Sequence, residues 1–196
     1  MKMAALALAV AITAVTSSST FADDRRRDAR VSTELSGYNE VHFIAGPPAA
    51  LRGAVSTVAT GSFKARIDQH SDTIHYELSY ENLEGAVTQA HIHFGQPHTV
   101  GGIVVWLCQT QGTPHPVAAL QETTPLCPGP QSGTVTGTIE PADVLAVTGQ
   151  GIEAGSFEEL VRAIRAGATY ANVHSSVFPP GEIRGQIGHR GHGDRD

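Results

Sequence analysis

The stretch SFKARIDQHSDTIHYELSY, residues 62–80, has the pattern of two β-strands joined by a turn. Apolar and polar residues alternate on both sides of the polar turn DQHSD at 68–72. The apolar positions are Phe63, Ala65 and Ile67 before the turn and Ile74, Tyr76, Leu78 and Tyr80 after it. Because successive side chains of a strand point to opposite faces, this period of two predicts an antiparallel hairpin with one buried face.

Other segments also have the character of strands. GTVTGTI at 133–139 alternates Val135 and Ile139 with threonines, and GIVVWLC at 102–108 is apolar on both faces. A short run that is apolar on both faces is typical of a central strand. The chain also contains 21 glycines and 11 prolines, which favour tight turns. Together these features predict an all-β domain, built as a sandwich or a barrel.

One segment departs from the period of two. SFEELVRAIRA predicts a short α-helix near 157–166, and its apolar stripe consists of Phe157, Leu160, Val161 and Ile164. Ser156 and Glu159 fit a capping box at the start of this helix, and Gly167 stands where a left-handed residue ends one. We expect the stripe to pack against the sheet, with no chemistry implied.

The first residues have the features of a secretory signal. Lys2 is followed by an apolar run from Met3 to Val15, and a small-residue pattern ends at Ala22. The run is too short for a membrane span, which needs about 20 apolar residues. The sequence therefore predicts a signal peptide at 1–22 and an exported protein, secreted or periplasmic, with no membrane span.

Polar segments flank the expected fold. DDRRRDAR at 23–30 mixes charges of both signs, and residues 189–196 are equally polar. We predict an arm and a disordered tail in these two places, with a single β domain at 31–188 between them. The formal net charge of −6 gives no sign of the basic surface that binds nucleic acid, so no nucleic acid partner is expected.

Cys108 and Cys127 are the only cysteines of the chain. In an exported protein two cysteines are expected to pair, and this spacing is not that of a CxxC redox motif. The segment between them is rich in Pro, Thr and Gln and has no strong helical or strand pattern. We therefore predict a loop closed by a structural disulfide.

Histidines stand at regular positions in two of the expected strands. In AHIHFG at 90–95, His91 and His93 fall on the face opposite Ala90 and Ile92, about 6.6 Å apart at the rise of a strand. In YANVHSS at 170–176, His174 likewise falls on the face opposite the small apolar residues. If the two strands lie close together, three imidazoles gather on the outer side of the sheet.

Two interpretations of this cluster are open. Neutral imidazole is a common ligand of copper and zinc, so His91, His93 and His174 are candidate metal ligands, with His98 as a candidate fourth. The alternative is three polar side chains that bond to the backbone of loops, since no zinc-finger or HExxH spacing is present. No catalytic residues are predicted, because the chain shows no nucleophile elbow, spaced carboxylate pair or phosphate loop.

Several segments resemble one known family. AHIHFG with the following GGIVVWL, the terminal YANVHSSVFPPGEIRGQI, and the upstream LSGYNEV and ATGSFKARID are similar to the CHRD domain of chordin and of many bacterial exported proteins. The resemblance covers roughly residues 31–188. It implies a Greek-key β-sandwich of the immunoglobulin-like or Cu,Zn superoxide dismutase-like kind, without an established catalytic activity. We therefore expect an exported module with a binding or structural role and an unknown protein or envelope partner.

AHIHFG is also similar to the HxH strand of Cu/Zn superoxide dismutases, where two copper ligands face outward beneath loops. This resemblance makes a copper or zinc site, with dismutase-like chemistry, the alternative to a plain binding module. The chain departs from that family, however. Nothing in it clearly supplies the histidine that bridges copper and zinc or the aspartate of the zinc site.

The segment GEIRGQI at 181–187 has a structural and a functional interpretation. Ile183 and Ile187 are expected to face inward, with Glu182 and Arg184 on the other side. In the structural interpretation the two charged residues pair with each other or with neighbouring strands. In the functional one, Arg184 faces the histidines and guides an anion toward them.

Overall fold

The computed structural model describes residues 29–44 and 51–189. The predicted signal peptide at 1–22 lies outside these residues, as do most of the predicted arm at 23–30 and nearly all of the predicted tail at 189–196. Within the part that is described, no helix has the length and apolar character needed to cross a bilayer.

Most regular structure in the described residues is β-strand. The strands are β1 (Ala29–Ser36), β2 (His42–Ile44), β3 (Leu51–Gly53), β4 (Thr60–Asp68), β5 (Thr73–Glu81), β6 (Val87–Phe94), β7 (Gly102–Cys108), β8 (Gly133–Ile139), β9 (Thr169–Ser175), β10 (Ile183–Gln186) and β11 (Gly188–His189). The helices are α1 (Phe157–Arg165) and the short 3-10 turns η3 (Gly37–Asn39), η4 (Ala118–Leu120), η5 (Pro141–Asp143) and η6 (Thr148–Gln150).

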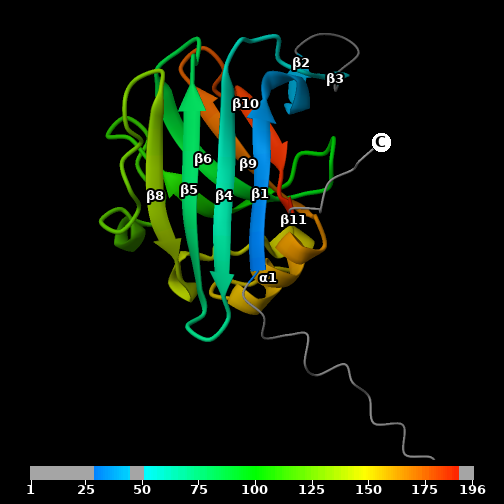
Figure 1. The fold of residues 1–196 in the computed structure, drawn as a ribbon, viewed down its shortest axis with the longest axis vertical. Coiled ribbons are helices and arrows are strands. Elements are labelled where there is room, and N and C mark those ends of the chain that lie inside the picture. Colours follow the sequence, from blue (N-terminus) through cyan, green and yellow to red (C-terminus); the bar gives the residue numbers. More distant parts are fainter. Residues whose placement is uncertain (1–28, 45–50, 190–196) are drawn as a thin grey trace, which may run out of the picture.

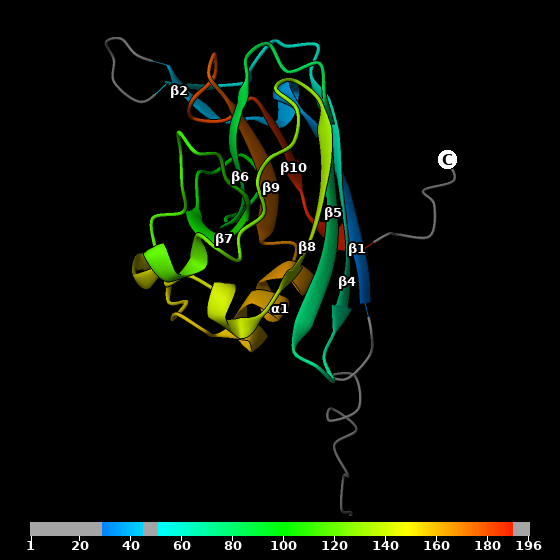
Figure 2. The same ribbon diagram turned by 90° about the vertical axis from the view of Figure 1, so that its left-hand side faces the viewer.

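The main sheet is antiparallel and runs in the order β7-β6-β9-β10-β1-β4-β5-β8, with β11 paired to β1. It curls so that β8, β5, β4 and β1 form one layer and β10, β9, β6 and β7 the other (Figures 1 and 2). The sheet is thereby nearly closed into a barrel, with the hydrophobic core between the layers and α1 at one end. The all-β fold with one α-helix is confirmed. The Greek-key sandwich of the immunoglobulin or superoxide dismutase kind stays a prediction.

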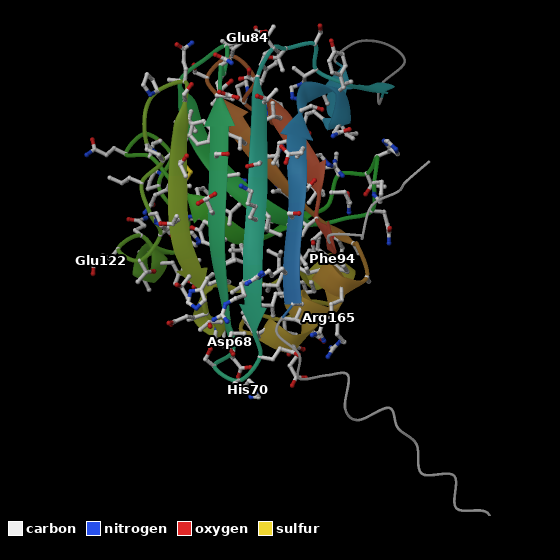
Figure 3. All side chains as sticks on the ribbon, viewed as in Figure 1. Asp68, His70, Glu84, Phe94, Glu122 and Arg165 are labelled. Carbon is white, nitrogen blue, oxygen red and sulfur yellow. A yellow bond between two sulfur atoms is a disulfide. The ribbon has the colours of Figure 1, made fainter. Side chains whose placement is uncertain are left out.

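The hairpin predicted at 62–80 is formed by β4 and β5. Its register pairs Phe63 with Leu78 and Ile67 with Ile74, and all four side chains are buried. At the tip, the Asp68 carboxylate accepts the backbone N–H of His70 at 2.9 Å (Figure 3). The alternation therefore predicted both the strands and their buried face, because each signal lies within a few residues of the chain.

β7 is the terminal strand of the main sheet, so the prediction of a central strand at 102–108 is wrong. The segment that follows β8 covers its free edge. Leu145 donates its N–H to the carbonyl of Val104 at 2.9 Å, and the Gln150 side chain accepts the N–H of Gly102 at 2.8 Å. An apolar run on both faces thus predicts that a strand is buried, but not where it lies in the sheet. A terminal strand is also buried when other segments cover it.

α1 buries its predicted stripe, and Gly167 ends it with a left-handed φ of 64°. The predicted capping box is wrong, because the Ser156 side chain makes no capping hydrogen bond. The backbone carbonyl of Ser156 accepts the N–H groups of Glu159 and Leu160 instead. The Glu159 side chain accepts a hydrogen bond from Arg162 at 3.3 Å and so does not reach back to the cap.

The predicted disulfide joins Cys108 and Cys127, and it closes the loop at 109–126. Gln109 organises this loop from a buried position. Its side-chain amide donates to the carbonyls of Gln121 and Thr124 at 2.6 and 2.8 Å, and its oxygen accepts the N–H of His115 at 2.7 Å. The loop is therefore fixed both covalently and by hydrogen bonds to one buried amide.

The double substitution Cys108→Ala/Cys127→Ala should lower the free energy of unfolding by about 3 kcal/mol, because the unfolded chain regains the freedom of this loop. Urea denaturation of the oxidised wild type and the variant measures the difference. A reducing agent should shift the wild type toward the variant and leave the variant unchanged. Equal midpoints for the oxidised wild type and the variant would show that the disulfide does not stabilise the fold.

Candidate metal centre

β6 and β9 are neighbours in the sheet, and their register brings the histidines together. Gln89 pairs with His174, His91 with Asn172 and His93 with Tyr170. All six side chains therefore fall on one face of the sheet. The opposite face of the same strands contributes Ala90, Ile92, Ala171 and Val173 to the hydrophobic core. The structure thus places the three histidines on the side of the sheet away from the core.

The three imidazoles converge. One ring nitrogen each from His91, His93 and His174 can be chosen so that all three lie within 4.8 Å of one another. His91 Nδ1 and His174 Nε2 lie 3.2 Å apart. His98, the candidate fourth ligand, is exposed in the turn after β6 with a φ of 62° and does not belong to this group.

The cluster is enclosed although it lies outside the core. The exposed fractions of His91, His93 and His174 are 0%, 8% and 6%. Trp106 of β7 packs against His91 with ring centroids 4.3 Å apart, and His115 of the disulfide loop packs against Trp106 at 5.0 Å. The loop at 109–126 therefore helps to cover the histidine face, a relation that the sequence left open.

Two of the three rings are fixed by backbone carbonyls. His93 Nδ1 lies 2.9 Å from the carbonyl of Gly101, and His174 Nδ1 lies 2.7 Å from that of Pro179. A carbonyl only accepts, so in each ring the proton sits on Nδ1 and Nε2 carries the lone pair. Metal-binding histidines almost always donate their second ring N–H in this way, which sets the tautomer and the direction of the ring.

Some buried polar atoms of the cluster have no hydrogen-bond partner. His91 Nε2 and His93 Nε2 are fully buried, and neither has a partner among the described residues. A buried polar atom without a partner costs about 1–3 kcal/mol. His91 Nδ1–H can donate to His174 Nε2, but this bond leaves the acceptor of His93 unused. A bound cation would satisfy lone pairs that the protein itself leaves without a donor.

Burial keeps these imidazoles uncharged. Desolvation lowers the pKa of His93 to about 4 and that of His174 to about 4. The pKa of His91 is lowered well below its usual value, first by desolvation and then by the other two histidines. All three rings are therefore neutral at pH 7, which is the form that binds a metal ion.

Arg184 lies beside the cluster on the neighbouring strand β10, where it pairs with Asn172, and 2% of its surface is exposed. Its guanidinium stacks on Tyr170, with Cζ 3.3 Å from the ring centroid, and Tyr170 in turn stacks on His93 at 4.7 Å. Arg184 also donates to the carbonyls of Thr99 and Gln96 at 2.7 and 3.2 Å. It thereby braces the turn that carries the Gly101 carbonyl. A role in guiding anions stays a prediction.

The predicted pairing of Glu182 with Arg184 is not among the ion pairs of the described residues. One Glu182 oxygen instead accepts the Thr57 hydroxyl at 2.9 Å and the N–H of Glu84 at 2.8 Å. The alternation was correct in placing Ile183 in the core. The partners of the charged residues were not predictable, because they come from loops far away in the sequence.

Sequence reasoning missed Glu40 and Asn172 beside the cluster. The Asn172 amide donates to one oxygen of the Glu40 carboxylate, and the other oxygen accepts the N–H of Val41 at 2.9 Å. Burial raises the pKa of Glu40. Asn172 could have been found, since it shares the face of His174 in the same strand. Glu40 gives no such local signal.

Gly181 lies directly over this pair with a φ of 134°. A Cβ there would lie 2.5 Å from Asn172 Nδ2 and 2.6 Å from a Glu40 oxygen. Gly181→Ala should therefore destabilise the fold by about 1–3 kcal/mol, through backbone strain and these contacts. Thermal unfolding measures the effect. The control is Gly149→Ala, where a Cβ meets nothing within 4 Å; equal losses in both variants would contradict the prediction.

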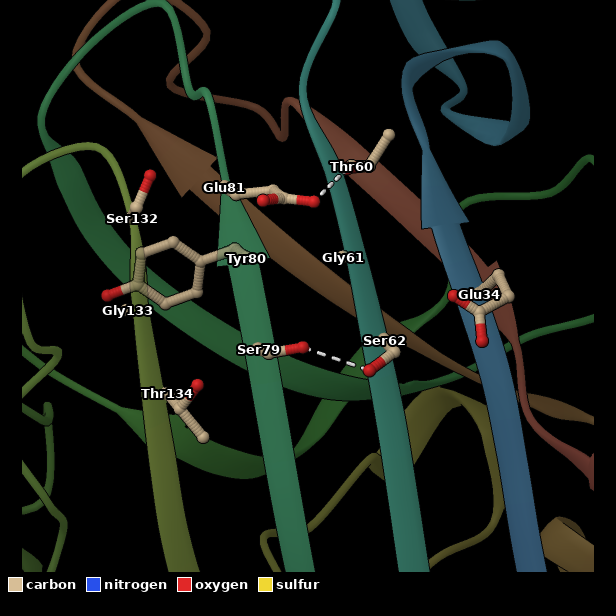
Figure 4. Close-up of a pocket in the computed structure, with 10 residues that line it drawn as sticks. All are labelled: Glu34, Thr60, Gly61, Ser62, Ser79, Tyr80, Glu81, Ser132, Gly133 and Thr134. Atoms are coloured by element: carbon tan, nitrogen blue, oxygen red, sulfur yellow. Dashed lines mark hydrogen bonds between the residues drawn. The ribbon is translucent and has the colours of Figure 1, made fainter.

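A polar hollow lies on the outer face of the layer formed by β1, β4, β5 and β8 (Figure 4). Its polar side chains bond to one another: Ser62 with Ser79 at 2.9 Å, and Thr60 to Glu81 at 3.2 Å. The histidine strands β6 and β9 belong to the opposite layer, so this hollow is separate from the cluster.

Comparison with known proteins gives one match. The family model of the CHRD domain matches residues 31–187, which is nearly all of the described chain. No curated protein and no solved structure matches the chain significantly.

Proposed function

Because the chain belongs to the CHRD domain family, we propose that it is an exported, non-catalytic module with a binding or structural role, and that its histidine cluster holds a copper or zinc ion. The disulfide supports export, since such bonds persist in oxidising compartments. The cell envelope and the extracellular space are both such compartments. The partner of the module is a protein or another envelope component.

The arrangement of the rings carries the metal proposal. His93 and His174 each give their Nδ1–H to a carbonyl, and one ring nitrogen each of His91, His93 and His174 lies within 4.8 Å of the others. Imidazole nitrogens that share a zinc ion lie about 2.0–2.1 Å from it, so tetrahedral geometry places them a little over 3 Å apart. The separation of 3.2 Å between His91 and His174 agrees with this value.

The enclosure supports a structural role for the ion. Its ligands come from β6 and β9, and the carbonyls that orient them belong to the turns at 95–101 and 176–181. An ion bound here would hold both turns against the sheet. Catalytic sites keep an open coordination position. Exposed fractions of 0–8% for the three ligands therefore favour the structural role over dismutase-like chemistry.

We propose in addition that the strand order is of the Greek-key kind found in superoxide dismutase-like sandwiches. The connections from β5 to β6, from β7 to β8 and from β8 to β9 all pass from one layer to the other. A solved structure of this chain or of a close relative would test the assignment.

The metal proposal is tested by the metal content of the protein. The parent for this experiment carries His189→Asn and His192→Asn, so that the C-terminal histidines cannot bind metal. After incubation with excess copper or zinc and desalting, we expect one ion per chain. His91→Ala/His93→Ala/His174→Ala in this parent should retain none. The control His70→Ala/His75→Ala/His98→Ala changes three exposed histidines and should bind like the parent.

Equal metal content in the parent and the cluster variant would overturn the metal proposal. The exported module would then remain as the function, with the three imidazoles serving as buried polar side chains.

A further inference from the structure

We propose that the cluster of His91, His93 and His174 selects monovalent copper, Cu(I), over zinc. This inference rests on the proposed function, since it requires that the cluster hold an ion at all. It adds the identity and charge of that ion.

The first step is the number of donors. The converging group consists of three imidazoles, and no carboxylate or thiolate of the described residues belongs to it. Both cysteines are joined in the disulfide, and Glu40 is bonded to Asn172 and to the N–H of Val41. Zinc in proteins almost always takes four ligands. Cu(I) is stable with three nitrogen donors, so the cluster offers it a complete set.

The second step is the charge of the ligands. His93 and His174 are held as neutral rings by their Nδ1–H bonds to carbonyls, and His91 has no acidic partner in the part of the chain that the structure describes. A set of three neutral ligands leaves the full charge of the ion uncompensated. The cost of moving a charge into a medium of low dielectric constant rises with the square of that charge. In this enclosed site a divalent ion therefore costs far more than a monovalent one.

The third step is the nearby fixed charge. The buried guanidinium of Arg184 stacks on Tyr170, which stacks on His93. This positive charge repels any cation in the cluster, and it repels a divalent ion twice as strongly. Glu40 is the nearby carboxylate; burial raises its pKa, and its two oxygens accept N–H groups of Asn172 and Val41 rather than pointing to the cluster. The surroundings therefore add to the preference for the lower charge.

The enclosure of the cluster also favours Cu(I) over zinc. Zinc bound by three histidines usually completes its shell with water. Trp106 and Tyr170 pack on the ligand rings, and none of the three ligands is more than 8% exposed. Access for a water ligand is thus restricted, and so is access for an oxidant that would convert Cu(I) to Cu(II).

Anaerobic competition titrations test the proposal with the parent that lacks the C-terminal histidines. Cu(I) is titrated against a chromogenic Cu(I) chelator, and zinc against a fluorescent zinc chelator. Trp106 is the only tryptophan and lies 4.3 Å from His91, so its fluorescence reports occupancy in both titrations. We expect Cu(I) to bind at least about a thousandfold more tightly than zinc.

Zinc binding that is as tight as Cu(I) binding, or tighter, would overturn the selection and leave the proposed metal site intact. Failure of both ions to bind would overturn the metal site itself. The two failures are therefore distinguishable from the same pair of titrations.

A substitution tests the electrostatic step. Arg184→Met should narrow the ratio of Cu(I) to zinc affinity by at least about tenfold, because it removes the buried positive charge. The control is Lys64→Met, which removes an exposed positive charge from the opposite layer and should leave the ratio unchanged. An unchanged ratio in a folded Arg184→Met protein would overturn this step. If that variant does not fold, the ratio of Cu(I) to zinc affinity in the wild type decides whether the cluster selects Cu(I).

Discussion

Replacing His174 with alanine should lower the affinity of the cluster for its ion by about a thousandfold or more. Apparent binding free energies of structural zinc sites are about 10–16 kcal/mol, so one of three donors accounts for several kcal/mol. The substitution also leaves the Pro179 carbonyl without the N–H that it accepts at 2.7 Å. The turn at 176–181 then loses one of its hydrogen bonds to β9, while those between Ser175 and Phe178 remain.

Competition with a chelator of known affinity measures this loss. His98→Ala is the matched control, since His98 is an exposed histidine outside the converging group, and it should change the affinity less than threefold. His174→Gln retains a polar side chain but has no imidazole, and it should behave like the alanine variant. Affinities of His174→Ala and His98→Ala that agree within a factor of three would exclude His174 as a ligand.

The metal-free protein should lose much of its stability as the pH falls from about 6.5 to about 4. The pKa values of His93 and His174 are lowered by burial to about 4, whereas both side chains titrate near 6.5 in the unfolded chain. Between these values the unfolded state binds more protons, so acid favours unfolding. Each of these two histidines contributes on the order of 3 kcal/mol to the free energy of unfolding. This contribution is fully present above pH 6.5 and is lost as the pH falls toward 4.

Protonation of Glu40 has the opposite effect on stability and offsets part of this loss. Burial raises its pKa, so the folded state binds its proton more readily than the unfolded state does. The comparison is therefore made with His91→Gln/His93→Gln/His174→Gln, which keeps Glu40. Urea midpoints between pH 7 and pH 4.5 should fall steeply for the metal-free parent and much less for the variant. Parallel pH dependence in both proteins would show that the three histidines do not titrate as buried groups.

The features that the sequence predicted well are those with local causes. The alternation at 62–80 fixed the inner face of β4 and β5, and the left-handed glycine after α1 was visible as a single residue in the right place. The same parity rule placed His91, His93 and His174 on the side opposite the apolar residues of their strands. In each case the signal and the structure that it predicts lie within a few residues of each other.

The features that escaped prediction depend on distant segments. The position of β7 at an end of the sheet was missed, because its edge is covered by residues near Leu145 that follow another strand. The capping box is a local exception: the Ser156 side chain makes no capping hydrogen bond, and Glu159 bonds to Arg162 in the next turn. The carbonyls that orient the histidines belong to irregular turns, whose conformation no short pattern encodes. The convergence of the rings required the pairing of β6 with β9, which lie far apart in the chain.

Anomalous diffraction from crystals grown with Cu(I) under anaerobic conditions, recorded on both sides of the copper edge, tests the central claim most directly. A single strong peak should lie about 2.0–2.1 Å from one ring nitrogen each of His91, His93 and His174, with Nε2 as the donor of His93 and of His174. No peak between these rings in a fully loaded crystal, or a peak only at other histidines of the chain, would contradict it.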